Sequence, residues 1–338
     1  MKFKKILQWA ILLVIAAVLL FFAFKGVKWE DFVDGIKSCN FFWIVVSMLV
    51  SVAVFWLRGL RWRLSMLPLD ESITPMESYN GVMFGYLLNF VFPRAGELAR
   101  CGVIAATGKA SFQSVLGSVV LERSWDMLCY ILILLAVLVG GESALRNFIQ
   151  NDIFAPASAA LSFNVLWIVA AVLVLGVAAL VLILKYRNYL RRFKVAGKIL
   201  DIIEGAFKGF VMGFKMKHKW SFFLYTLLIW LGYWMMSYST ILAFPQVGDL
   251  GASDALFLMV VGSLGWIVPV QGGIGAYHFI LSLALSTIYG IPQTSGVIFA
   301  TISHESQALT MLLFGAISLV AVSLSPSYKK VKMKKQTL

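Results

Sequence analysis

The sequence predicts an all-α polytopic membrane protein with about six transmembrane helices and two re-entrant or broken helical hairpins in an inverted repeat. Of its 338 residues, 60% are hydrophobic and 13% are charged, and the mean hydropathy is +0.87. This composition excludes ordinary soluble folds. Several runs approach the roughly 20 apolar residues that a bilayer-spanning helix requires. Two short polar segments containing proline and glycine interrupt the apolar pattern in related ways.

Six apolar spans and two interrupted regions follow one another along the chain. The spans are residues 6–24, 41–60, 115–140, 161–184, 220–244 and 295–324, and the interrupted regions are 80–107 and 254–289. The first span follows a basic N-terminus and has no small-residue cleavage site after it, which favours a retained signal anchor over a cleaved signal peptide.

We expect a single transmembrane domain over residues 1–338. Its parts are an anchor helix (6–24), a first repeat (41–140), a connecting helix with a basic cytoplasmic segment (161–219), a second repeat (220–324) and a basic cytoplasmic tail (325–338). Hydrophobic residues recur at helical spacing within 185–219. This segment is either a helix on the membrane surface or a solvated connector.

The positions of Lys and Arg orient the spans. The net charge of +13 resides mostly in loops, which favours anionic lipid headgroups over nucleic acid as the partner. Residues 185–219 hold ten Lys or Arg residues, whereas 220–328 hold none. The positive-inside rule therefore places both termini in the cytoplasm. Arg58, Arg61 and Arg63 are interpreted as orientation signals and headgroup anchors.

Parity of the spans then fixes the direction of the interrupted regions. Region 80–107 enters and leaves from the cytoplasm, and region 254–289 enters and leaves from outside. Residues 80–92 give about 20 Å of helix, short of the roughly 30 Å apolar core, so the first region is predicted to be a re-entrant hairpin. For the second region, a hairpin and two full spans both remain open.

Each interrupted region has a proline followed three residues later by a glycine, at Pro93 and Gly96 and at Pro269 and Gly272. Backbone without hydrogen bonds is not tolerated facing lipid, so such breaks occur at membrane depth only where they line a protein cavity. A pair of broken segments in the two halves of a chain indicates a transporter-like binding site.

Three motifs resemble those of the lysylphosphatidylglycerol synthase transmembrane-domain family. They are Asn89, Pro93, Gly96, Glu97 and Arg100 in Asn-x-x-x-Pro-x-x-Gly-Glu-x-x-Arg; Val119, Glu122, Arg123 and Asp126 in Val-x-x-Glu-Arg-x-x-Asp; and Pro269, Gly272, Gly273 and Gly275 in Pro-x-x-Gly-Gly-x-Gly. The resemblance implies an integral membrane protein of bacteria or archaea, here of the bacterial cytoplasmic (inner) membrane. The best understood members carry this region as a flippase for aminoacylated phospholipids, fused to a soluble aminoacyl-transfer domain. The chain ends soon after its last apolar span, so we expect that domain to be absent.

The first interrupted region concentrates charge at its break. Charged residues inside a membrane usually face the protein interior and are paired. Arg94 and Arg100 are predicted to bind a lipid phosphate, helped by free amides at the start of a half-helix. Glu97 would balance their charge or contact an amine of the lipid. The alternative is a salt bridge that closes the hairpin.

Two further groups lie in spans. Glu122 and Asp126 share a helix face and would repel each other unless a cation such as Arg123 intervenes, either as a structural ionic cluster or in transport. The adjacent His304 and Glu305 either carry a proton or only form local hydrogen bonds.

The second break supplies further candidates. Gln271 joins Pro269, Gly272, Gly273 and Gly275 as a predicted binding residue, and the glycines allow close backbone approach. His278 is a weaker candidate. The three cysteines are scattered, and no second histidine follows His304 at i+4. We therefore expect no metal site, cofactor or catalytic nucleophile.

Taken together, the sequence predicts a flippase or transporter of a phosphate-bearing lipid. The substrate would be an aminoacyl phospholipid or an isoprenoid-phosphate-linked lipid. Two alternatives remain open: an intramembrane lipid-modifying enzyme, which requires a nucleophile or a metal cluster, and a non-transporting partner of a separate lipid-modifying enzyme.

Overall fold

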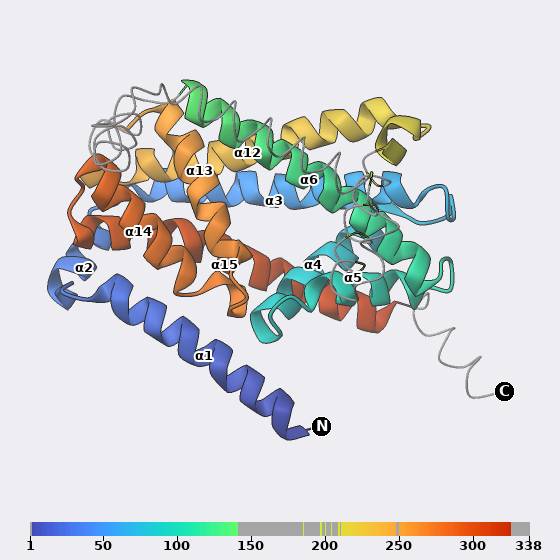
Figure 1. Ribbon diagram of the computed structural model, residues 1–338, viewed down its shortest axis with the longest axis horizontal. Coiled ribbons are helices and arrows are strands. Elements are labelled where there is room, and N and C mark those ends of the chain that lie inside the picture. The colour runs from blue at the N-terminus through green and yellow to red at the C-terminus, as the bar shows by residue number, and fades with distance from the viewer. Residues whose placement is uncertain are drawn as a thin grey trace. The chain divides into compact units, whose positions relative to one another are not determined.

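The computed structural model describes residues 2–140, 211–247 and 250–325, with a few isolated positions between 141 and 210 (Figure 1). Every regular element in this described part is a helix. The elements in order are α1 (Lys2–Phe24), α2 (Trp29–Lys37), α3 (Phe41–Met66), α4 (Pro75–Val91), α5 (Gly96–Ala105), α6 (Phe112–Gly140), α12 (Lys219–Ala243), η2 (Pro245–Val247), α13 (Ala252–Ile267), η3 (Gln271–Gly273), α14 (Ala276–Tyr289) and α15 (Gln293–Leu324).

The chain divides into two compact units, each described by itself. The first comprises Met1–Val119 and His218–Leu338, and the second comprises Val120–Lys217. The first unit contains both interrupted regions. The predicted span 161–184, most of the basic segment 185–219 and the tail beyond residue 325 lie outside the described residues.

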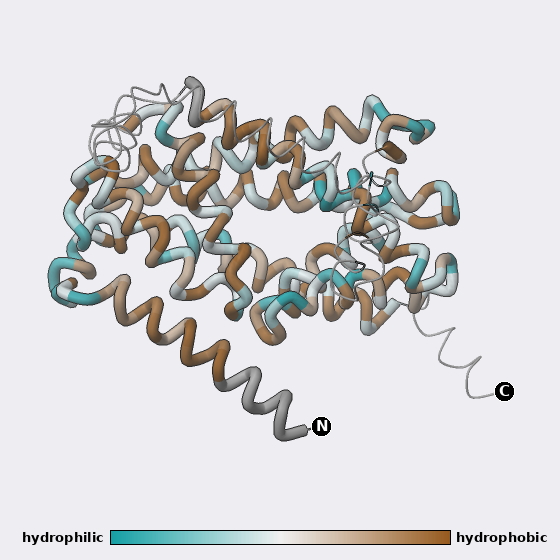
Figure 2. The backbone as a smooth tube through the Cα atoms, in the orientation of Figure 1, coloured by the Kyte–Doolittle hydropathy of each residue, from teal (hydrophilic) through white to brown (hydrophobic). Residues whose placement is uncertain are grey.

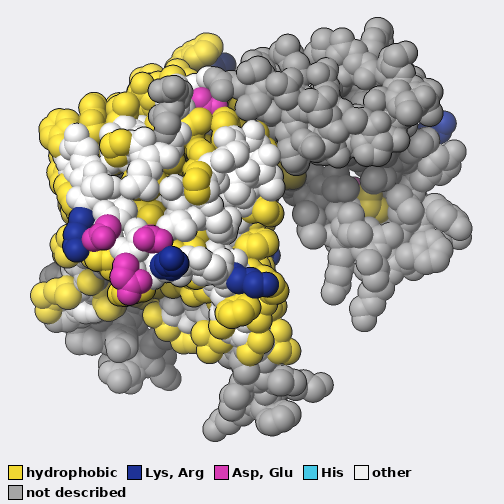
Figure 3. Space-filling model, turned by 90° about the vertical axis from the view of Figure 1, so that its left-hand side faces the viewer, with side chains coloured by type: hydrophobic (Ala, Val, Ile, Leu, Met, Phe, Trp, Pro, Cys, Tyr) yellow, Lys and Arg dark blue, Asp and Glu magenta, His cyan; other side chains and the backbone are white. Residues whose placement is uncertain are grey.

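The prediction of a multi-pass membrane protein is confirmed, while the count of six spans stays a prediction because span 161–184 lies outside the described residues. Within the described residues, four helical stretches are long and apolar enough to cross a membrane: Phe41–Met66, Lys219–Ala243, Gln271–Tyr289 and Gln293–Leu324. A fifth is possible if Ile11–Phe24 and Trp29–Lys37, which meet at 82°, count as one bent span. Figure 2 shows how apolar residues dominate these helices, and Figure 3 shows a small group of acidic and basic side chains within a mainly apolar and uncharged face.

Helices α3 and α12 pack along each other in antiparallel directions. At one end of the pair, the backbone amide of Asn40 donates to the Ala243 carbonyl oxygen at 2.7 Å. At the other end, Arg61 Nη1 donates to Thr226 Oγ1 at 3.3 Å. The first helices of the two halves therefore run in opposite directions, as the charge distribution predicted.

Arg58 and Arg61 are not headgroup anchors. Both are buried, at 7% and 0% relative exposure. Arg58 donates to the Tyr233 hydroxyl at 2.8 Å, and its guanidinium lies over the Tyr86 ring. Arg61 reaches Thr226 and lies over the Phe222 ring. The prediction was wrong because α3 continues past residue 60 to Met66, which keeps these arginines on the α12-facing side of a longer helix.

One hydrophobic cluster of this unit lies among α3, α4, α12 and α15. Its buried side chains are Val54, Phe55, Met83, Ile229, Met236 and Met311. The cluster thus joins the first hairpin to helices of both halves. Because buried apolar side chains pack closely, the α4 arm of the hairpin is held against these helices.

Both interrupted regions form helical hairpins in which each α-helical arm is shorter than the apolar core of a membrane. The arms α4 and α5 have 17 and 10 residues, and α13 and α14 have 16 and 14. At 1.5 Å per residue the longest arm is about 26 Å, against an apolar core of about 30 Å. The stretch Gln271–Tyr289 gains span length only by including η3, within which Gly272 has a non-helical φ of 56°. This geometry favours the hairpin over two full spans.

The hairpins enter the α3–α12 pair from opposite ends. At the C-terminal end of α3, Arg63 Nε donates to the Ile73 carbonyl oxygen just before α4. At the N-terminal end of α3, Gln246 joins Ser38 to Ser295 beside the start of α15. The bases of the two hairpins therefore lie at opposite ends of α3. A full inverted repeat, including α6, stays a prediction.

Candidate functional site where the hairpin tips meet

The first hairpin tip is a tight turn built around glycine. Asn89, in the last turn of α4, accepts the backbone amide of Gly96, the first residue of α5, at 2.8 Å. A Cβ atom on Gly85 would lie 2.8 Å from the Gly96 carbonyl oxygen, and one on Gly96 would collide with Gly85 and Asn89. The two arms are therefore in backbone contact, which accounts for the glycine after Pro93.

Arg94 occupies the turn in an unusual conformation. In the described residues it is the one non-glycine residue with positive φ, at 61°. Its side chain is exposed, and Nη2 donates to the carbonyl oxygen of Ile267 at 2.5 Å. Ile267 is the last residue of α13, where the helix dipole favours a cation. Arg94 thus links the tip of the first hairpin to the tip of the second.

The second tip is a glycine turn that contacts the first. Gly272, Gly273 and Gly275 have φ values of 56°, 77° and 82°, a region that glycine adopts without steric cost. A Cβ atom on Gly272 would collide with the Phe90 ring of α4. The close approach predicted for these glycines is therefore present, and the two tips touch.

Gln271 presents an unused hydrogen-bond acceptor at this junction. Its Oε1 atom is buried and has no hydrogen-bond partner among the described residues. Leaving a buried polar atom without a partner costs on the order of 1–3 kcal/mol, so such atoms usually form a hydrogen bond with a ligand or with water. Pro269, two residues earlier, is exposed.

Arg100 is engaged within its own hairpin. Its Nη2 atom lies 2.6 Å from Glu97 Oε2, and its guanidinium lies 4.7 Å from the centre of the Trp62 ring. Arg100 is buried, whereas Arg94 is exposed. The structure therefore fits the salt-bridge alternative for Arg100 and Glu97, and it leaves Arg94 as the more accessible cation of the two.

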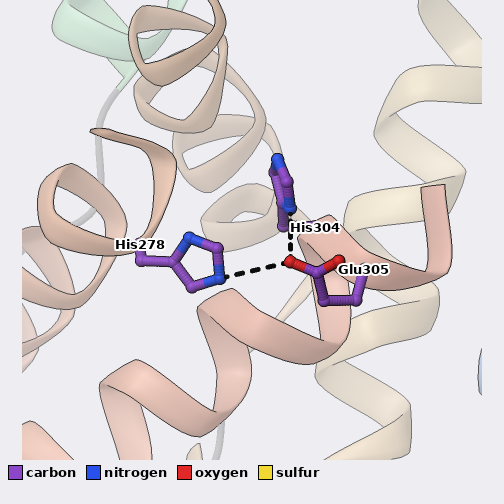
Figure 4. A group of neighbouring side chains, drawn as sticks. All are labelled: His278, His304 and Glu305. Atoms are coloured by element: carbon purple, nitrogen blue, oxygen red, sulfur yellow. Dashed lines mark hydrogen bonds and ion pairs between the residues drawn. The ribbon is translucent and has the colours of Figure 1, made fainter. Parts of the chain in front are cut away.

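His304 is held by contacts on both ring nitrogens (Figure 4). Nδ1 lies 2.9 Å from Glu305 Oε1, and Nε2 lies 2.8 Å from the Gly272 carbonyl oxygen. Since a carbonyl oxygen only accepts, Nε2 carries a hydrogen. Proton coupling by this pair stays a prediction.

His278 joins the same group, which the sequence did not reveal. Its Nε2 atom lies 3.6 Å from Glu305 Oε1, and its ring centre lies 5.0 Å from that of His304. His278 and His304 are 26 residues apart on α14 and α15, which pack against each other. Only the hairpin geometry brings them together, so no local motif could have identified the group.

The acidic and basic side chains on α6 belong to the second compact unit. There Arg123 Nη1 lies 3.3 Å from Asp126 Oδ2, and Glu122 is fully buried. We describe this group apart from the hairpin tips, and its part in binding stays a prediction.

One family model matches nearly the whole chain. The model described as the lysylphosphatidylglycerol synthase TM region matches residues 9–315, a stretch that contains both hairpins and the histidine pair. No curated protein and no solved structure matches the chain. The protein therefore belongs to the lysylphosphatidylglycerol synthase transmembrane-region family.

Proposed function

We propose that the protein moves a phosphate-bearing lipid between the leaflets of the bacterial cytoplasmic membrane, with both termini in the cytoplasm. The substrate is an aminoacyl phospholipid or an isoprenoid-phosphate-linked lipid. Membership of a family associated with lipid modification or flipping supports a lipid substrate. The observation that carries the proposal is the contact between the tips of the two hairpins, through Arg94 with Ile267 and Phe90 with Gly272.

In this proposal the touching tips form the closed state. A lipid headgroup entering along either hairpin meets Arg94, whose planar guanidinium suits a phosphate oxygen pair. The phosphate replaces the Ile267 carbonyl oxygen as the partner of Arg94, so binding loosens the tips. Gln271 Oε1 accepts a hydrogen bond from an amine or hydroxyl of the headgroup. Alternate opening towards each end gives alternating access.

The other residues of the first tip hold Arg94 in place. Asn89 holds the start of α5, and the Arg100–Glu97 pair anchors α5 against Trp62. These contacts keep the turn in the geometry that gives Arg94 its positive φ. A strained backbone conformation persists only where surrounding contacts hold it in place, and such residues concentrate at functional sites.

Lipid exchange in reconstituted vesicles tests the proposal. Purified protein is placed in liposomes with a fluorescent anionic phospholipid, and a membrane-impermeant quencher measures the fraction in the outer leaflet over time. Arg94→Gln is expected to reduce the exchange rate by at least about 10-fold, since a charge-assisted bond contributes roughly 1.5–3 kcal/mol. Lys37→Gln, an exposed cation on α2, serves as the control and should leave the rate unchanged.

Unchanged exchange in a well-folded Arg94→Gln protein would reject the role of Arg94. Absence of exchange in the unmodified protein, with every candidate headgroup supplied, would reject transport itself and favour the non-transporting partner. In that case the protein would act by recruiting a separate lipid-modifying enzyme.

The grouping of His278, His304 and Glu305 favours one competing function, an intramembrane lipid-modifying enzyme. We expected no such cluster from the sequence. The two functions separate when purified protein is incubated with radiolabelled lipid and the lipids are then resolved by chromatography. We expect the lipid to be recovered chemically unchanged. A modified lipid formed without exchange between leaflets would support the enzyme.

A further inference from the structure

The trio of His278, His304 and Glu305 has the donor set of a transition-metal site. We propose that these three side chains bind one divalent cation of the zinc class. The inference does not depend on lipid transport. It rests on four observations: the donor types, their spacing, the hydrogen bond behind one ligand, and the absence of another partner for His278.

The donor types select the metal. Two imidazole nitrogens and one carboxylate oxygen suit Zn²⁺ and its transition-metal neighbours, whereas Mg²⁺ and Ca²⁺ prefer oxygen ligands alone. Three protein ligands leave the fourth position of a tetrahedral Zn²⁺ for water. Of the three side chains, the two histidines are buried and Glu305 is half exposed.

The spacing of the donors fits a common tetrahedral ion. Zinc bonds of about 2.0–2.2 Å place neighbouring ligand atoms about 3.4 Å apart. The His304 Nδ1 to Glu305 Oε1 distance is 2.9 Å, and the His278 Nε2 to Glu305 Oε1 distance is 3.6 Å. All three donor atoms lie within 4.8 Å of one another. Figure 4 shows the rings of both histidines directed at the same carboxylate.

The outer contacts of His304 are those of a metal ligand. Histidines that bind metals usually donate their other ring N–H to a carboxylate or a backbone carbonyl, which fixes the tautomer. His304 Nε2 makes this bond to the Gly272 carbonyl oxygen at 2.8 Å, so the Nδ1 lone pair points towards Glu305 and His278. The Trp266 ring stacks on the imidazole at 4.9 Å and fixes its plane.

Neither ring nitrogen of His278 forms a hydrogen bond within the described structure. It is 2% exposed, its Nδ1 atom has no hydrogen-bond partner, and its Nε2 atom is 3.6 Å from Glu305, which is longer than a hydrogen bond. Buried polar groups normally have a partner. A cation between His278 Nε2 and Glu305 Oε1 supplies a partner for Nε2.

Metal analysis of the purified protein tests the site. The full chain is purified with a tag that contains no histidine, incubated with Zn²⁺, dialysed, and measured by mass spectrometry for metal. We expect one zinc per chain, lost in His278→Ala and in His304→Ala. The sequence holds a third histidine, the exposed His218, so His218→Ala is the matched control and should keep the zinc.

A second measurement needs no variant and guards against misfolding. Co²⁺ added to the unmodified protein should give the intense visible absorption of a tetrahedral site, and Zn²⁺ should displace it. Glu305→Gln, which keeps the side-chain size, should weaken that absorption. Protein that takes up neither metal, or that binds zinc equally in His278→Ala and His218→Ala, would overturn the proposal.

Discussion

Arg94 combines an exposed cation with a backbone conformation that L-amino acids seldom adopt. Its φ of 61° costs roughly 1–2 kcal/mol for a residue with a Cβ atom, and glycine avoids this cost. Its side chain bonds the C-terminal carbonyl of α13. An ordinary turn would place glycine here, so the arginine side chain is retained at an energetic cost.

Two substitutions separate the side chain of Arg94 from its backbone. Arg94→Gly and Arg94→Ala both remove the guanidinium, but only alanine keeps the strained φ. We expect Arg94→Gly to be more stable than Arg94→Ala by about 1 kcal/mol, with both lacking lipid exchange. Denaturant unfolding in detergent measures the difference. Equal stability of the two variants would mean that residue 94 does not adopt the positive φ.

Individual residues also show which features could be predicted from the sequence and which could not. The Pro93 and Gly96 motif identified the first tip, because helix breakers act locally. Arg58 and Arg61 were misjudged, because a count of basic residues near a helix end does not reveal which face of the helix is buried. His278 was undervalued, because its neighbours His304 and Glu305 lie on another helix. Such contacts depend on tertiary packing and have no local signature.

At the scale of elements, the first hairpin depends on the backbone contact between α4 and α5. Gly96→Ala would push a methyl group into Gly85 and Asn89 and should destabilise the protein by about 1–3 kcal/mol. Gly102 lies in the same helix with open space around it, so Gly102→Ala should be neutral or stabilising by up to about 1 kcal/mol.

Thermal unfolding of the two glycine variants, followed by circular dichroism, checks this expectation. If Gly96→Ala unfolds at the same temperature as Gly102→Ala, the arms of the first hairpin are not in backbone contact. The structure would then have no explanation for the glycine that follows Pro93.

The sequence predicted the existence of both hairpins more accurately than their boundaries. The start of α4 at Pro75 precedes the expected residue 80. The capping box of Thr74 and Glu77, with proline at the first helical position, is a local signal that would have located this start. The contact between the tips was less predictable, because it depends on how α4 and α13 pack against the other helices.

At the scale of the whole molecule, the central claim is that the two hairpins enter the membrane from opposite faces and that their tips touch. The antiparallel α3 and α12 helices and the contacts at the two hairpin bases support this arrangement. A lipid path that opens alternately to each side requires it. Hairpins that entered from one face would make only a one-sided cavity.

Site-directed labelling of the hairpin bases tests this claim most directly. Ser72→Cys, before α4, and Ser253→Cys, in α13, are conservative replacements of exposed serines at the bases of the two hairpins. Cys101 and Cys129 are replaced by serine, and burial already raises the pKa of the Cys39 thiol to about 11, which limits its reaction at neutral pH.

A membrane-impermeant maleimide is then applied to intact cells and, separately, to inverted membrane vesicles. We predict that Ser253→Cys reacts only from the outside and that Ser72→Cys reacts only from the cytoplasmic side. Labelling of both cysteines from the same side would contradict the opposed hairpins, and the proposed lipid path with them.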